Sequence, residues 1–437
     1  MQRWTMIGLG MALAAYLGAC GSDSEFRSAA PPGGSSAGGS AGAPGSGGSA
    51  AGAPGSGGSA AGAPGSGGST AGSPSVGGAT AGGAGGTPGA GGTPGAGGIP
   101  AGGAGGSGGA AAVPVGVIAF ARANSAVTAS SEPEPKFSYN VAGGALTATR
   151  SSAGVYRMTF GGLTLGSLAG IHSNVQVSTQ GLGKAVCTAA SWGNDSVNVT
   201  CFAAGTPVDS QYTVTVIQSG TQAAADTQVS LRGFAYASLP TDASYTPVAG
   251  YSFVAGGGTI TAARTDVGKY TMDFGGITLT DTGSVQVSAY ASASNCVVAR
   301  WGILAPGTVE VNCFDTAGNP VDTKYSISVF RPVPAGINNG GEIMAYAWAD
   351  DSAAASYAPS SNYLFWSGGA MAERTAVGKY SMTLTGASLM GANAQVVGYG
   401  SKSLCTPVSW ANSKVNVACY DPAGNPVDSQ YSLLVMK

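Results

Sequence analysis

Seven cysteines are the residues of this chain with the clearest chemistry. Six of them form pairs that recur at one place in a longer repeat, with partners separated by 14 to 17 positions: Cys187 and Cys201, Cys296 and Cys313, Cys405 and Cys419. An even set of cysteines at repeated spacing in an exported chain indicates a disulfide framework. We therefore predict three local disulfides formed in an oxidising compartment. Cys20 is left without a partner.

An arginine, an aspartate and a tryptophan also recur once in each copy. The arginines lie six residues before a shared tyrosine, the aspartates end a Pro-Val-Asp segment, and the tryptophans follow the first cysteine by five residues. These residues are Arg150, Arg264 and Arg374; Asp209, Asp322 and Asp428; and Trp192, Trp301 and Trp410. A guanidinium pairs well with a carboxylate or with turn carbonyls, so we interpret all nine as structural residues. A repeated pocket for an anion or a sugar is the alternative.

Mid-strand amides recur as well, and we expect them to hydrogen-bond across strands: Gln176, Gln286 and Gln395.

Catalytic and metal chemistry have little support in the residue types. His172 is the only histidine, and no serine or cysteine nucleophile stands in a matching context. We predict no enzymatic activity, no cofactor and no metal, with an extracellular hydrolase of unrecognised type kept as an alternative. Residues 315–322 and 421–428 place aspartate and asparagine at spacings that would suit calcium. The first copy lacks two of these oxygens at 203–209, which favours plain turns.

Two tryptophans that occur only in the third copy are the candidates for ligand contact. Trp348 and Trp366 could stack on a sugar or another flat apolar partner if their rings are exposed. The alternative is that they fill the core of the third copy, because large aromatic side chains are mostly well buried.

Three copies of one unit must position all of these residues. Self-comparison places the copies at 113–218, 226–332 and 339–437, each long enough for a core of its own. The run Gly154-x-Tyr156-x-Met158-x-Phe160 alternates with period two and recurs in each copy. In the second copy the predicted strands are 231–237, 251–254, 259–263, 269–274, 285–290, 296–301, 309–314 and 325–330. The predicted fold is all-β, with three tandem antiparallel β-sandwich domains, Ig-like or jelly-roll-like.

The N-terminus reads as a processing signal. Arg3 precedes an uncharged, mostly apolar run over residues 4–19, which is short for a membrane span. The segment Leu17-Gly18-Ala19-Cys20 resembles the bacterial lipoprotein signal. That resemblance implies removal of residues 1–19, lipidation of Cys20 and attachment to the cell envelope, at the outer membrane or cell surface. An ordinary secretory signal is the alternative.

A low-complexity segment follows from residue 20 to residue 112. It is rich in Gly, Ala, Ser and Pro, and residues 28–121 contain no charged side chain. Its ten-residue repeat excludes a collagen helix, which needs glycine at every third position. We predict a disordered stalk that spans on the order of 50 Å.

The whole chain has a net charge of −2 and no cluster of basic residues. It therefore lacks the positive surface that a nucleic-acid-binding protein needs, and we expect no nucleic-acid partner.

The segments 311–322 and 325–330 of the second copy resemble a repeat of uncharacterised secreted proteins and lipoproteins of high-GC bacteria. The resemblance covers about 320 residues and implies location and modularity without chemistry. We expect a surface lipoprotein whose tandem repeats bind or adhere to a glycan or another envelope component. A structural envelope spacer without ligand is the alternative, and the oligomeric state is left open.

Overall fold

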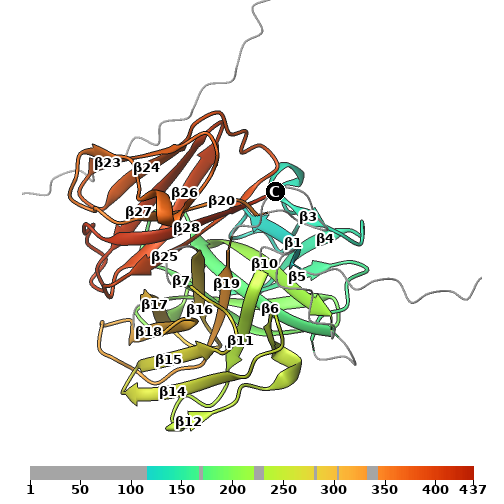
Figure 1. Cartoon of the computed structure of the whole chain (residues 1–437). Coiled ribbons are helices and arrows are strands. Elements are labelled where there is room, and N and C mark those ends of the chain that lie inside the picture. Colours follow the sequence, from blue (N-terminus) through green and yellow to red (C-terminus); the bar gives the residue numbers. More distant parts are fainter. Residues whose placement is uncertain (1–115, 167–170, 221–230, 280–282, 303–304, 332–342) are drawn as a thin grey trace, which may run out of the picture. The chain divides into compact units, whose positions relative to one another are not determined.

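The computed structural model describes residues 116–166, 171–220, 231–279, 283–302, 305–331 and 343–437 (Figure 1). The predicted signal peptide, the lipidation site at Cys20 and the predicted stalk lie outside these residues. The described residues belong to one compact unit of the chain. Among them, no helix has the length and apolar character needed to cross a membrane.

Each repeat is built from short strands and one 3-10 helix. The elements of the first repeat are β1 (Gly116–Ala123), β2 (Ser130–Ser131), η1 (Pro135–Phe137), β3 (Tyr139–Asn140), β4 (Leu146–Ser152), β5 (Val155–Phe160), β6 (Ile171–Gln180), β7 (Val186–Gly193), β8 (Ser196–Ala203), β9 (Thr206–Pro207) and β10 (Gln211–Gly220). Those of the second are β11 (Leu231–Ala237), β12 (Ser244–Tyr245), η2 (Ala249–Tyr251), β13 (Ser252–Val254), β14 (Ile260–Asp266), β15 (Lys269–Phe274), β16 (Ser284–Ala289), β17 (Ser294–Trp301), β18 (Thr308–Asp315) and β19 (Tyr325–Phe330). Those of the third are β20 (Ile343–Ala349), β21 (Ser356–Tyr357), η3 (Ser361–Tyr363), β22 (Leu364–Phe365), β23 (Ala370–Ala376), β24 (Lys379–Leu384), β25 (Asn393–Tyr399), β26 (Leu404–Ala411), β27 (Lys414–Tyr420) and β28 (Gln430–Met436).

The strands of every repeat form two antiparallel sheets in the same order, which confirms the predicted all-β class (Figure 1). In the first repeat, one sheet has the order β3-β1-β10-β6 and the other β2-β4-β5-β8-β7. The second repeat has β13-β11-β19-β16 and β12-β14-β15-β18-β17. The third repeat follows the same scheme. A parallel bridge between Val298 and Tyr399 joins its strand β25 to β17 of the second repeat.

The period-two pattern of the sequence sets which side chains enter the core. Along β5, Tyr156, Met158 and Phe160 are buried, whereas Arg157 between them is exposed. Alternate side chains of a strand point to opposite faces of its sheet, so this spacing gives one apolar face. The hairpin before it turns at Gly154, whose φ of +69° favours glycine. A side chain there would also meet the backbone of Val208.

Most strands predicted for the second repeat are confirmed within two residues. The predictions for 231–237, 269–274 and 325–330 coincide with β11, β15 and β19. No strand is predicted at β12, because two residues are too few for a periodic pattern to appear. The predicted strand 251–254 is wrong at its first residue, because η2 extends through Tyr251 before β13 begins.

Every repeat has a hydrophobic core between its two sheets, and a fourth core is shared by all three repeats. The shared core takes equivalent side chains from the first and last long strands of each repeat, namely Phe120, Phe234, Tyr346, Ile217, Phe330 and Met436. All six are nearly inaccessible to solvent. The repeats therefore bury apolar surface against one another as well as within themselves.

Candidate functional site

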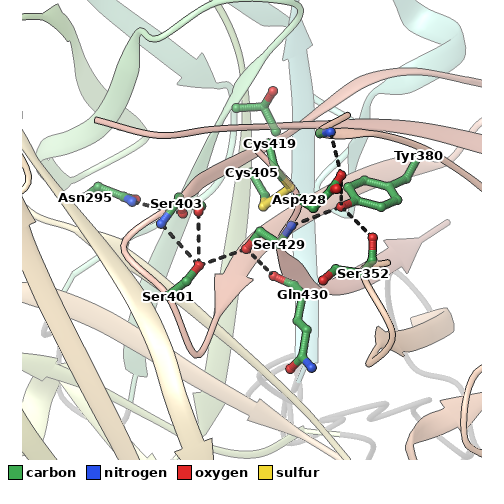
Figure 2. Close-up of a disulfide and its surroundings, with 12 residues drawn as sticks. Asn295, Ser352, Tyr380, Ser401, Ser403, Cys405, Cys419, Asp428, Ser429 and Gln430 are labelled. Atoms are coloured by element: carbon green, nitrogen blue, oxygen red, sulfur yellow. Dashed lines mark hydrogen bonds between the residues drawn. A yellow bond between two sulfur atoms is a disulfide. The ribbon is translucent and has the colours of Figure 1, made fainter. Parts of the chain in front are cut away.

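The recurring arginine and aspartate form a closely bonded network in each repeat. Figure 2 shows the Asp428 carboxylate of the third repeat beside the Tyr380 hydroxyl. The Asp428 carboxylate accepts two hydrogen bonds from Arg374, at 2.9 and 2.8 Å. It also accepts one from the backbone N–H of Gly378 at 2.9 Å and one from the Tyr380 hydroxyl at 3.2 Å. The first and second repeats have the same bidentate pair, at 2.8 and 2.9 Å respectively.

These contacts hold the carboxylates in their charged form. Hydrogen bonds from Arg374, together with those from Gly378 and Tyr380, lower the pKa of Asp428 to about 2. The pKa values of Asp209 and Asp322 are lowered as well, again chiefly by their arginines. Each carboxylate already accepts four protein donors. The network therefore fastens the Pro-Val-Asp segment to the β-hairpin that carries the shared tyrosine, and it leaves little capacity for an anion or a sugar.

The three predicted disulfides are confirmed. They join directly paired residues of neighbouring strands in every repeat: Cys187 to Cys201, Cys296 to Cys313 and Cys405 to Cys419. Figure 2 shows the disulfide of the third repeat. Because they link paired positions, they oppose a slip of register that would turn core side chains outward.

The recurring tryptophans lie where one repeat contacts the next. Trp192 of the first repeat meets three tyrosine rings of the second at centroid distances of 5.3 to 5.7 Å: Tyr236, Tyr251 and Tyr290. All three contacts are edge-to-face, the geometry that aromatic pairs favour.

Trp301 of the second repeat meets the equivalent residues of the third. Its ring lies 5.9 Å from Trp348, 5.6 Å from Tyr363 and 5.2 Å from Tyr399. Trp301 is only 4% exposed, so this contact is part of the protein interior.

Trp410 of the third repeat returns to the first. It packs edge-to-face against Phe137 at 5.6 Å, and the guanidinium of Arg122 lies 5.1 Å from its ring centroid. Arg122 also donates to Gln180 at 3.0 Å. By position in the repeat, Arg122, Phe137 and Gln180 stand where the second repeat has Tyr236, Tyr251 and Tyr290. The third contact thus uses a cation over an aromatic ring instead of a wholly aromatic cluster.

Backbone hydrogen bonds repeat the same cycle. Ala291 donates to Ala189 at 2.8 Å, which joins the second repeat to the first. Gly400 donates to Val298 at 2.9 Å, which joins the third to the second. Gly181 donates to Pro407 at 3.0 Å, which joins the first to the third. The acceptors all lie two residues after the first cysteine of their repeat, so the three contacts are equivalent and together form a closed cycle.

Two of the three recurring glutamines form hydrogen bonds between repeats. Gln395 of the third repeat donates to Thr215 of the first at 2.8 Å, and Gln286 donates to Ser432 of the third at 3.4 Å. Gln176 instead donates to Asn174, two residues away on the same strand. The expectation of a hydrogen bond to another strand is therefore wrong for Gln176, whereas Gln286 and Gln395 do bond to other strands, which belong to a different repeat.

The two tryptophans proposed to face a ligand have different surroundings. Trp348 is partly buried between Trp301, Tyr363 and Tyr399, and its indole nitrogen is shielded from solvent. Packing occupies this ring, so its placement does not favour ligand contact. Trp366 is partly exposed, and its indole N–H donates to the Thr385 carbonyl at 2.8 Å.

The aspartates of the possible calcium loops hold turns in the structure. The Asp315 carboxylate accepts the backbone N–H groups of Ala317 and Asn319, both at 2.9 Å, and the Asn319 side chain at 3.1 Å. Asp421 makes matching bonds to Asn425. Across the described residues, no group of three or more His, Cys, Asp or Glu side chains is placed to hold a metal ion.

His172 lies between the first and second repeats. Its Nδ1 contacts the backbone carbonyl oxygens of Ala249 and Ser252, the latter at 3.0 Å. An imidazole used in this way orders the chain around η2, and no hydroxyl or thiol of a described residue is bonded to it.

No protein-family model, no curated protein and no solved structure matches this chain.

Proposed function

We propose that this protein is an exported, lipid-anchored protein of the bacterial cell envelope whose three repeats act together as one rigid binding or adhesion head. Its ligand class is a glycan or another envelope polymer. The Cys20 signal supports the anchor, and the composition of residues 20–112 supports a stalk. The three disulfides indicate an oxidising compartment.

The observation that carries the proposal is the closed cycle of equivalent contacts among the repeats. Three copies that interlock through Trp192, Trp301 and Trp410 hold any surface site in a fixed orientation. A preorganised surface loses less conformational freedom on binding than separate modules on linkers. We therefore favour one rigid head over three independent modules that gain affinity through avidity.

A cosedimentation assay tests the binding function. The mature, disulfide-intact protein would be mixed with insoluble polysaccharides and with isolated cell envelopes, with and without calcium. Retention on a polysaccharide or envelope matrix supports a binding head. Absence of retention on every matrix, under both conditions, contradicts it.

Anchoring is tested separately by fractionating the producing cells. Cys20→Ala should move the protein from the membrane fraction to the soluble exported fraction. Membrane association that survives this substitution would contradict anchoring through Cys20.

A structural spacer is the second candidate, and one observation favours it. The polar and aromatic side chains that recur in all three repeats are used in internal contacts, as Asp428 and Trp301 illustrate. A spacer needs rigidity and no ligand. Deletion of a single repeat does not separate the two functions, because it would expose an aromatic interface and create nonspecific binding.

A further inference from the structure

The three repeats serve as internal controls for one another, because their common fold explains the residues that they share. Residues of one repeat that depart from the other two need a separate explanation. The first repeat departs in this way around η1 and β3. It has Glu132 where the others have Thr246 and Ala358, and it has Tyr139 where the others have Phe253 and Phe365.

A surface groove of about 310 Å³ lies at this place in the first repeat. Its lining includes Glu132, Pro133, Pro135, Tyr139, Asn140 and Leu146. This volume is at the lower end of the range of roughly 300 to 1,000 Å³ that is usual for small-molecule sites. The groove borders β3, which is the edge strand of its sheet.

Asn140 holds the shape of this groove and is not free for a ligand. Its amide nitrogen donates to the carbonyl oxygens of Gly144 at 3.0 Å and Gly161 at 2.9 Å. Its side-chain oxygen accepts the N–H of Ala142 at 3.1 Å. In the third repeat the indole of Trp366 takes over the bond to the equivalent carbonyl, that of Thr385. The shape of the loop can therefore be maintained by another side chain.

Glu132 and Tyr139 have no such internal role. The exposed Glu132 carboxylate has no ion pair or hydrogen bond with any described residue. The Tyr139 ring packs against Phe120 at 5.7 Å, as the Phe253 ring packs against Phe234 at 5.8 Å. The fold thus uses only the ring, and the additional hydroxyl has no hydrogen-bond partner among the described residues.

We propose that this groove of the first repeat binds a sugar unit of an uncharged polysaccharide, with Glu132 and Tyr139 as its hydrogen-bonding groups. A carboxylate accepts hydrogen bonds from sugar hydroxyls, and a phenol can donate or accept one. Pro135 and Leu146 supply apolar surface for the C–H faces of the ring. The unpaired charge of Glu132 disfavours acidic polymers. The inference rests on the proposed binding function and adds to it the site and the ligand class.

The test uses the mature protein in cosedimentation with insoluble uncharged polysaccharides and with envelope fractions. The double variant Glu132→Thr, Tyr139→Phe gives these two positions the residues of the second repeat, which has the same fold. It should retain the thermal midpoint of the unmodified protein and weaken polysaccharide binding at least tenfold. Glu132→Thr alone and Tyr139→Phe alone should each give part of this loss.

Two control variants accompany it. Thr246→Ala changes the position equivalent to Glu132 in the second repeat, and Glu373→Ala removes an exposed carboxylate of the third. Neither should alter retention. Polysaccharide binding that is unchanged in the double variant overturns the site while leaving the binding function intact. Retention on envelope protein but on no polysaccharide overturns the ligand class. Retention on no matrix overturns both the site and the binding function.

Discussion

Trp301 offers the sharpest test of the conclusion that the repeats form one body. Its ring is 4% exposed and meets three aromatic rings of the third repeat. Replacing a buried tryptophan by alanine typically costs about 3 to 5 kcal/mol, because apolar contacts are lost and a cavity remains. The buried indole nitrogen has no hydrogen-bond partner among the described residues, so no hydrogen bond is lost with it. We therefore expect Trp301→Ala to lower the free energy of unfolding by about 3 kcal/mol, at the lower end of that range.

Urea titration of the oxidised protein, followed by far-ultraviolet circular dichroism, measures this loss without depending on tryptophan fluorescence. Trp301 couples the second and third repeats, so the variant should also unfold over a broader range of urea, with a smaller slope of free energy against denaturant. A transition that broadens in this way indicates that one repeat has begun to unfold before the others.

Trp366→Ala is the matched control. This tryptophan is partly exposed and makes one hydrogen bond, to Thr385. Its removal should cost only about 1 to 2 kcal/mol, from one hydrogen bond and partial burial. If Trp301→Ala costs no more than Trp366→Ala, then the interface stabilises the protein no more than a partly exposed contact does, and the reasoning is wrong.

Three further results are expected. Gly378→Ala should destabilise the protein more than Gly386→Ala. Both glycines have positive φ, but only at Gly378 would a side chain meet backbone atoms, the nearest at 2.5 Å. Equal urea midpoints for the two variants would contradict this prediction. The pKa of Asp428 is lowered to about 2, so its contribution to stability is present above its ordinary pKa near 4 and is lost as the pH falls from about 4 to about 2. Thermal midpoints measured across that range should fall less steeply for Asp428→Asn than for the unmodified protein, and parallel curves would count against the ion pair. Replacing both Cys405 and Cys419 by serine should cost about 3 kcal/mol, since the disulfide closes a loop with a separation of 14 residues, and urea titration that shows no loss would contradict a stabilising role.

Features that lie within one repeat could be predicted because they leave a pattern along the chain. Alternation at Tyr156, Met158 and Phe160 reveals a strand with one buried face. The spacing of Cys405 and Cys419 reveals a staple between neighbouring strands. Repetition in three copies strengthens each of these signals, since every copy reports on the same local geometry.

Contacts between repeats leave no pattern of this kind. Each copy carries both a tryptophan and the cluster that receives one, so the sequence alone cannot distinguish packing within a copy from packing against its neighbour. Trp348 is predicted to contact a ligand because a tryptophan occurs at this position in one copy only, yet it occupies the place held by Tyr236 in the second repeat and Arg122 in the first. Its role became visible only once residues far apart in the chain were brought together.

The chain's own sequence thus determined the all-β class, the disulfide pairs and the positions that recur, because these depend on neighbours within a strand or a hairpin. The tertiary structure decided that the recurring tryptophans join the repeats in a cycle, and that Glu132 and Tyr139 of the first repeat share a groove. Both outcomes depend on which surfaces pack together or remain open, a matter of burial and shape in three dimensions that spacing along the chain does not record.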